Sequence, residues 1–197
     1  MLIRWAAEGQ VTPEEIEAQL RKQQMVRVLQ AELPHRFERA ARVKLQQVIP
    51  HHWFSAAASE CARMFIAGFF YGCITVAQAY IEALSKYLAE FHGLRVGKDT
   101  EERCRRLHKA GVISADALAA ALSVFSDRND YHHLNKDVEQ EYQKLSERAE
   151  ECVNHLHTLE SEVFAYTMGE GKVIVKEPKY WPPGGDGLIQ GYLRQLW

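Results

Sequence analysis

A long amphipathic pattern near the C-terminal end of the chain constrains the fold more than any other feature. Between residues 138 and 166, apolar residues recur at alternating spacings of four and three, namely Val138, Tyr142, Leu145, Ala149, Cys152, Leu156, Leu159, Val163 and Tyr166. This stripe is typical of a helix that packs nearly parallel or antiparallel to its neighbours. Leu156 and Leu159 lie in mid-stripe and are expected to be buried. Glu160 lies off the stripe, so its replacement by alanine is expected to cost little stability.

Apolar segments upstream supply partners for this helix, so a bundle is favoured over a lone coiled coil. At the N-terminal end, Thr12, Pro13 and Glu15 form a typical helix start. This first helix is expected to end before Pro34, because proline breaks the hydrogen-bond pattern of a helix. A second helix is expected over residues 35–49.

The middle of the chain is expected to form a series of further helices. Either Ser55 or Ser59 is expected to cap a helix that runs to residue 69, with a kink or tight turn at Gly68 and Gly72. Ser114 is expected to cap an alanine-rich helix. Helices are also expected over residues 72–91, 100–110 and 115–125. The sequence therefore predicts an all-α protein, an antiparallel helical bundle.

One segment raises the question of a membrane span. From Met64 to Ile81, eighteen residues carry no formal charge, which is the lower limit for a transmembrane helix. However, Thr75 and Gln78 interrupt this run, and the helical pattern continues into a charged segment. A helix buried inside the bundle explains the same composition, so no membrane association is expected.

Length and charge bound the function classes. A chain of 197 residues with 47% hydrophobic and 25% charged residues is typical of one domain with appendages. The formal net charge of −2 excludes a global basic field, so a nucleic-acid partner would have to bind a local patch. The N-terminal apolar run is too short for a secretory signal, and a cytoplasmic location is expected.

The cysteines and histidines do not form a recognisable metal framework. Four cysteines lie far apart in apolar stretches and are expected to be buried and reduced: Cys61, Cys73, Cys104 and Cys152. The histidine pairs His51–His52 and His155-x-His157 are about a hundred residues apart, and no cysteine or carboxylate cluster joins either pair. Neither a metal nor a cofactor is expected.

The chain changes character after Met168. A short strand-like run, Val173 to Val175, is followed by turn residues and a segment too small to fold by itself. This tail is expected to pack on the bundle, to pack on a partner subunit, or to stay mobile. The sequence therefore indicates three parts: an N-terminal helical extension (1–54), a helical bundle (55–168) and a C-terminal tail (169–197).

The segment SDRNDYHHLNKD, residues 126–137, concentrates reactive polar groups between two predicted helices. Asn129 and His133 are four residues apart and share a face if the helix continues, while His132 lies most nearly over Arg128. Arginine offers a fork of donors to phosphate oxygens, and histidine exchanges a proton near neutral pH. By itself this spacing is weak support for a site, because charged residues near helix ends are usually solvated.

The Arg-Asn-x-x-x-His sequence, between the apolar segment 65–91 and a long amphipathic helix, resembles the HEPN superfamily. In that family, an Rx4–6H motif in a helical bundle marks metal-independent ribonucleases. The resemblance covers residues 55–168 and implies that Arg128, Asn129 and His133 are catalytic. It also implies a homodimer whose two motifs face one cleft, where Arg128 stabilises the phosphate, His133 transfers a proton and Asn129 positions a reacting group.

Two neighbouring residues are candidates for accessory roles. His132 could replace His133 or cap the turn, and the capping role is favoured. Glu82 resembles an acidic position that some family members carry on an earlier helix, but an exposed Glu82–Lys86 pair at i, i+4 is the plainer interpretation. In one toxin branch of the family, a tyrosine two residues after the histidine is modified, and here that position is Asn135.

Two basic clusters are candidates for binding RNA. One contains Arg95, Lys98, Arg103, Arg105, Arg106 and Lys109, and the other contains Arg36, Arg39, Arg42 and Lys44. Each is equally explained as a solvated helix face, but at the edge of the motif cleft either would attract phosphates. The leading expectation is an endoribonuclease with a toxin or defence role and an antitoxin or regulatory partner. The alternatives are a non-catalytic module that binds nucleotide, RNA or protein, and a helical scaffold.

Overall fold

The computed structural model describes residues 12–44, 47–95, 97–133, 135–136, 138, 140–184 and 189–194. The chain divides into two compact units between Glu38 and Arg39. Helix α1 (Pro13–Arg42) belongs to both, since its first part forms the N-terminal unit and its last turn belongs to the larger one. The fold of the larger unit positions the candidate site.

Helix α1 begins as the sequence predicts and ends later than predicted. The backbone N–H of Thr12 donates to the Glu15 carboxylate at 2.8 Å, and the N–H of Glu15 donates to the Thr12 hydroxyl. The predicted break at Pro34 is wrong, because the helix continues to Arg42. An exposed proline removes one helical hydrogen bond, and water can satisfy the carbonyl that loses it. The second predicted helix, 35–49, therefore does not exist as a separate element.

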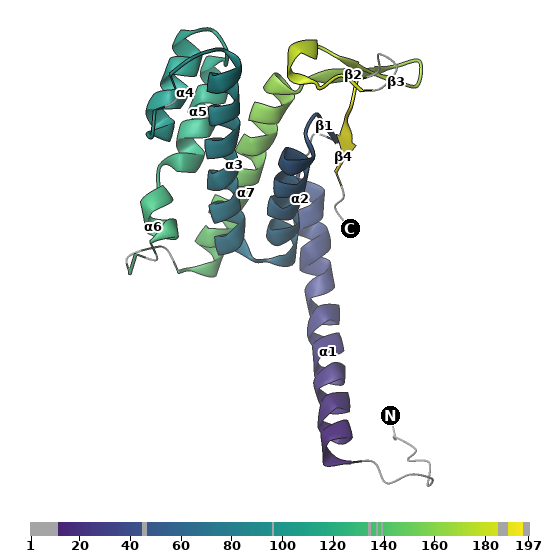
Figure 1. Cartoon of the computed structure of the whole chain (residues 1–197). Coiled ribbons are helices and arrows are strands. Elements are labelled where there is room, and N and C mark those ends of the chain that lie inside the picture. The colour runs from purple at the N-terminus through teal and green to yellow at the C-terminus, as the bar shows by residue number, and fades with distance from the viewer. Residues whose placement is uncertain are drawn as a thin grey trace. The chain divides into compact units, whose positions relative to one another are not determined.

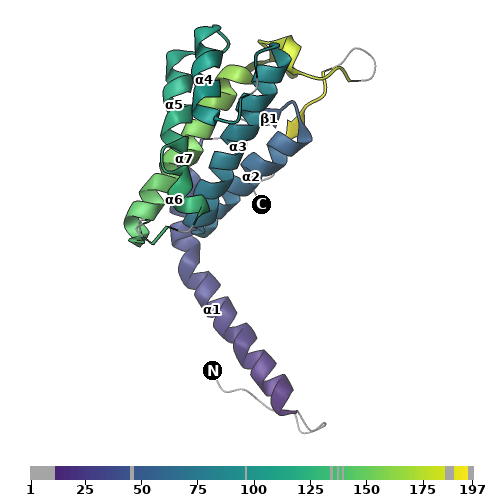
Figure 2. The same cartoon turned by 60° about the vertical axis from the view of Figure 1, so that its left-hand side comes forward.

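The larger unit is the all-α bundle that the sequence predicts (Figure 1). Its helices are α2 (His52–Ala67), α3 (Phe70–Phe91), α4 (Thr100–Lys109), α5 (Ala115–Phe125), α6 (Arg128–His132) and α7 (Tyr142–Val163). Helix α3 packs against all of the others, and α7 packs against α2, α3 and α5 (Figure 2). No helix in the described ranges is long and apolar enough to cross a membrane.

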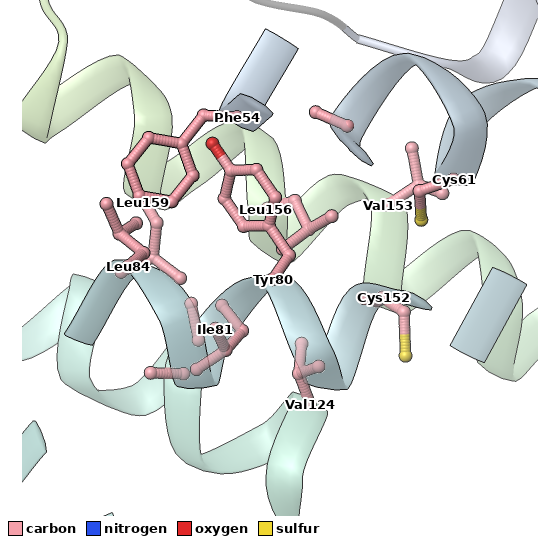
Figure 3. Packing of buried hydrophobic residues seen from close by; sticks show 14 of the residues in the cluster. Phe54, Cys61, Tyr80, Ile81, Leu84, Val124, Cys152, Val153, Leu156 and Leu159 are labelled. Atoms are coloured by element: carbon pink, nitrogen blue, oxygen red, sulfur yellow. The ribbon is translucent and has the colours of Figure 1, made fainter. Parts of the chain in front are cut away.

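The core forms where α2, α3, α5 and α7 meet (Figure 3). Leu156 and Leu159 are each only 3% exposed, which confirms their predicted burial. The pattern overstates the length of α7, since this helix begins at Tyr142, whose ring is 58% exposed. All four cysteines are buried and none forms a disulfide bond, as predicted, and burial raises the pKa of Cys104 to about 11.

Glu160 contradicts the prediction that it lies on a solvent face. Its side chain is fully buried, accepts a hydrogen bond of 2.7 Å from the Tyr80 hydroxyl, and pairs with Arg194. The pattern on α7 cannot reveal this, because Arg194 comes from the end of the chain and covers a face that the stripe leaves polar. Replacing Glu160 by alanine should therefore cost more stability than its place off the stripe suggested.

Local sequence signals account for some helix ends and fail at others. The Ser114 hydroxyl accepts a hydrogen bond from the N–H of Ala117, which confirms the predicted cap of α5. Gly68 ends α2 with φ of 85°, a left-handed conformation that glycine adopts without strain, so the tight turn is also confirmed. The predicted caps Ser55 and Ser59 are wrong, because α2 already begins at His52 and both serines are buried within it.

The C-terminal tail packs on the bundle, which is one of the three expected outcomes. Strands β2 (Tyr166–Gly169) and β3 (Lys172–Val175) form an antiparallel hairpin, as the strand-like run predicts. After a 3-10 turn (Pro178–Tyr180), strand β4 (Tyr192–Leu193) pairs with β1 (Val48–Ile49). Tyr180, Trp181 and Arg194 are buried, so these segments complete the core.

Candidate functional site

The motif forms a short separate helix, α6, between α5 and α7. Its first residue is Arg128, and His133 occupies the capping position at its end. The backbone N–H of His133 donates to the carbonyl of Asn129 at 3.1 Å, so one helical turn spans the two residues, as the sequence predicts. Leu134, Asp137 and Glu139 lie outside the described residues.

Contacts to two long helices anchor α6. Tyr131 is buried, and the Tyr71 hydroxyl on α3 donates to its carbonyl at 2.5 Å. On the other side, Arg148 of α7 lies 3.2 Å from the Asp127 carboxylate and donates to the carbonyl of Ser123. The five residues of α6 could not hold a helical shape alone, so these contacts give the motif its geometry.

Arg128 and Asn129 line a cleft of about 270 Å³ on the surface of the bundle. The cleft joins three parts of the chain: α3, the start of α4, and the junction of α5 and α6. Its other lining residues are Glu82, Lys98, Asp99, Thr100, Glu101, Phe125 and Ser126. His132 and His133 are not among the lining residues, and both are exposed beside it.

The Arg128 guanidinium is positioned by two contacts at the edge of this cleft. It lies 3.4 Å from the Glu82 carboxylate and 5.4 Å from the centre of the Phe125 ring. Its Nε atom is buried and has no hydrogen-bond partner within the part of the chain that the structure describes. Both side chains of the ion pair are more than one third exposed, so the pair contributes little to stability and can exchange partners.

Glu82 therefore faces the motif. It pairs with Arg128 and not with Lys86, the partner that the sequence spacing favoured. Lys86 instead lies 4.0 Å from Glu90, one turn further along α3. An i, i+4 spacing permits an ion pair but does not require it, because a nearby tertiary partner competes.

His132 belongs electrostatically to the same site. Partial burial lowers its pKa, as does the positive charge of Arg128, while the Glu82 carboxylate acts in the opposite direction. The nearby His133 lowers it further. The capping role favoured for His132 falls to its neighbour, because His132 is the last residue of α6 and His133 is the cap.

The larger basic cluster separates into residues with different environments. Lys98 lines the cleft, whereas Arg95 and Lys109 are exposed outside it. Arg105 and Arg106 pair with Glu101 and Glu102 on successive positions of α4, as solvated helix faces do. These five residues remain on the surface.

Arg103 corrects the expectation of a solvated cation. It is 4% exposed, and its guanidinium donates to the Ser85 hydroxyl at 3.0 Å and to the carbonyl of Gly97 at 2.7 Å. These bonds tie α4 to α3 and to the loop before α4. A phosphate could reach this guanidinium only if those bonds broke.

Two arginines of the second basic cluster form contacts with residues that do not line the cleft. Arg39 is buried, where it donates to the carbonyl of Ile66 and lies over the ring of Phe70. Arg42 pairs with Glu150 at 2.8 Å. Both are committed to contacts inside the larger unit, and Arg36 belongs to the N-terminal unit.

The sequence did not single out several residues of the cleft wall. Asp99, Thr100 and Glu101 join the motif because α4 packs against α3 and α5, whereas Phe125 and Ser126 precede it directly in the chain. A local signal existed for Asp99, since an aspartate before a helix is a typical cap, and its carboxylate accepts from the N–H of Glu102 at 3.0 Å. No local signal brings Glu101 into the same cleft as Arg128, whereas Phe125 precedes Arg128 by only three residues and contacts it through its ring.

Among the described residues, no group of three or more histidine, cysteine or acidic side chains is arranged to hold a metal ion. Burial lowers the pKa of His155 and of His157, which lie partly buried on α7. Comparison of the chain with models of protein families, with curated proteins and with solved structures gave no match.

Proposed function

We propose that this chain is a metal-independent endoribonuclease of the HEPN type. The observation that carries the proposal is that Arg128 and Asn129 line one cleft while the end of the same short helix presents His132 and His133. A guanidinium, an amide and an imidazole within one turn are the groups that phosphodiester cleavage needs. The anchoring of α6 by Tyr71 and Arg148 would hold them in place.

The proposed reaction uses the ribose as its own nucleophile. His133 removes the proton of the 2′-hydroxyl, and the 2′-oxygen attacks the adjacent phosphorus. The bond from phosphorus to the 5′-oxygen breaks, and that oxygen takes up a proton. The products are a 2′,3′-cyclic phosphate and a 5′-hydroxyl. Arg128 stabilises the negative charge that accumulates on the phosphate oxygens, and Asn129 orients a reacting group.

The proposal includes a homodimer in the cytoplasm. His133 does not line the cleft of its own chain, so a second copy that faces the first would bring an additional histidine to each cleft. An antitoxin or regulatory protein would then control the enzyme, in a toxin or defence role. A monomer that retains full activity at micromolar concentration, measured by light scattering, would contradict the dimeric site.

A second candidate is a non-catalytic module that binds a nucleotide, RNA or a protein. Two observations favour it. His133 lies outside the cleft, and three carboxylates, from Glu82, Asp99 and Glu101, line the cleft with only two cationic side chains. This charge balance is unusual for a surface that only attracts phosphates.

Labelled RNA incubated with four proteins distinguishes these candidates: the wild type, His133→Ala, His132→Ala and Arg128→Ala. General acid–base groups contribute roughly 10²- to 10⁴-fold, so His133→Ala should lose most of the cleavage while His132→Ala retains most of it. Arg128→Ala should weaken both affinity and rate. Cleavage should persist in EDTA and fail when deoxyribose replaces ribose.

The adjacent histidines suit this comparison, because both are exposed imidazoles that follow one another in the chain. Equal losses in the two histidine variants would assign the proton transfer to the pair rather than to His133. Undiminished cleavage in His133→Ala and Arg128→Ala would exclude the motif from the mechanism. If the wild type cleaves no RNA but binds it, the non-catalytic module is the correct assignment.

A further inference from the structure

The cleft beside Arg128 has a second wall that the proposed reaction does not use. This wall consists of Lys98, Asp99, Thr100 and Glu101 before and at the start of α4, and of Phe125 and Ser126 at the end of α5. At about 270 Å³, the cleft is smaller than the usual pocket for a drug-sized ligand. It suits one nucleotide rather than a duplex.

The two cations of the cleft suit a phosphate at its edge. The Arg128 side chain is 35% exposed, and its contact with Glu82 is long, so its exposed nitrogens can donate to a phosphate. Lys98 is also exposed and lines the same cleft. A nucleotide whose phosphate meets these two groups would leave its base to the other lining residues of the cleft.

The three carboxylates of the cleft differ in how strongly they are engaged. Glu82 balances the charge of Arg128 at 3.4 Å, and Asp99 caps α4 through the N–H of Glu102. Within the described part of the chain, the ion pair of Glu101 is a long surface contact of 3.7 Å with Arg105, one turn away on the same helix. Such pairs are weak, so the Glu101 carboxylate can change partner with little loss of stability.

We infer that this wall selects the base of the bound nucleotide and prefers guanine, with Glu101 as the residue that reads it. An ionised carboxylate only accepts hydrogen bonds. Guanine presents two adjacent donors, N1–H and the N2 amino group, which one carboxylate can accept together. Adenine and cytosine place an acceptor nitrogen beside their amino group, and uracil flanks its single N–H with two carbonyl oxygens.

This inference deepens the proposed function, because it names the nucleotide that the same cleft holds next to the cleaved bond. Its test does not need catalysis. Binding of guanosine, inosine, adenosine, cytidine and uridine 5′-monophosphates is measured by isothermal titration calorimetry on the full chain. The guanosine nucleotide should bind about 5- to 150-fold more tightly than the adenosine, cytidine and uridine nucleotides, the range of a good bidentate base contact. Inosine, which lacks the N2 amino group, should fall between.

Glu102 supplies a matched control, since it follows Glu101 on α4, pairs with Arg106 in the same i, i+4 manner and does not line the cleft. Glu101→Gln should remove the preference for guanine, whereas Glu102→Gln should preserve it. The thermal midpoints of the two variants should match, so that a folding defect is excluded. Equal binding of all five nucleotides, or a guanine preference that survives Glu101→Gln, would overturn the inference.

The two proposals fail in different ways. Guanine-selective binding that depends on Glu101, with no RNA cleavage, would contradict the ribonuclease and retain the base-reading wall. Cleavage at every base alike, unaffected by Glu101→Gln, would retain the ribonuclease and contradict the wall. Cleavage beside guanine that loses its selectivity in Glu101→Gln would support both.

Discussion

Two arginine–carboxylate pairs occupy opposite environments in the same bundle. Arg194 and Glu160 are buried between α7 and the tail, and the Tyr80 hydroxyl also bonds to Glu160. Arg128 and Glu82 meet at the edge of the cleft, where both remain partly exposed. The chemistry of the two pairs is the same, so their surroundings account for any difference in what they do.

The buried pair is suited to holding the fold together and the exposed pair to binding. Burial raises the pKa of Glu160, while the charge of Arg194 and the bond from Tyr80 oppose that rise. Removing one partner would leave an uncompensated charge in a medium that solvates it poorly. At the cleft, water takes over as a partner, so Arg128 can leave Glu82 for a phosphate at little cost.

The largest expected effect comes from breaking the buried pair. Arg194→Leu should lower the free energy of unfolding by about 3–5 kcal/mol, the usual cost of removing one member of a buried ion pair. Urea unfolding at pH 7.5 measures it. Adding Glu160→Leu to the first change should recover part of the loss, since no unpaired charge then remains. If Arg194→Leu lowers the free energy of unfolding by less than about 1 kcal/mol, water must solvate the Glu160 carboxylate in the variant.

The loss of stability in Arg194→Leu should depend on pH, and the structure gives the sign of this dependence. Because Arg194 lowers the pKa of Glu160, its removal raises that pKa further above the value in the unfolded chain. A raised folded-state pKa stabilises the protein at low pH, and this stabilisation is lost as the pH rises through it. The destabilisation by Arg194→Leu should therefore be smaller at pH 5 than at pH 7.5, relative to the wild type at each pH.

An apolar reference on α7 sharpens the comparison. Leu156→Ala should cost about 2–5 kcal/mol, because it removes a buried side chain and leaves a cavity. Its cost should not change between pH 5 and pH 7.5, in contrast to that of Arg194→Leu. Tyr142→Ala, at the exposed start of the same helix, is the control and should cost much less. Equal shifts of the urea midpoint would contradict the observed orientation of α7.

The smallest expected effect on stability comes from breaking the exposed pair. Glu82→Gln should change the free energy of unfolding by less than about 1 kcal/mol. It should nevertheless lower the pKa of His132, because the Glu82 carboxylate raises it, and Arg128→Gln should raise the same pKa. Imidazole titration followed by NMR measures both shifts. Shifts of the same sign in the two variants would mean that His132 does not sense this pair.

Local sequence signals predicted most element types, and they failed where distant contacts intervened. Ser114 caps α5 and Gly68 ends α2, because a hydroxyl acceptor and a glycine act within a few residues of their own position. Pro34 failed as a stop signal, because the last turn of α1 is secured by the contacts of Arg39 with Ile66 and Phe70. At Pro34, tertiary packing therefore outweighed the low helix propensity of proline.

The candidate site divides in the same way. The spacing of Arg128, Asn129 and His133 could be read along the chain, because one short helix contains it. The partners of Arg128 could not be read, since Glu82 lies 46 residues upstream and was equally placed to pair with Lys86. The sequence indicated a surface cation at Arg103, but its side chain is buried and links α4 to α3 by a hydrogen bond to Ser85.

By itself, the sequence determined the all-α class, the burial of Leu156 and Leu159, the helix ends with local caps, and the grouping of three motif residues. These features follow from periodicity and short-range hydrogen bonding, which act over a few residues. Only the tertiary structure decided that Glu160 is buried against Arg194, and that Glu82 and Glu101 line one cleft with Arg128. Such pairings depend on which helix faces pack together, and the energies that select them come from contacts between residues far apart in the chain.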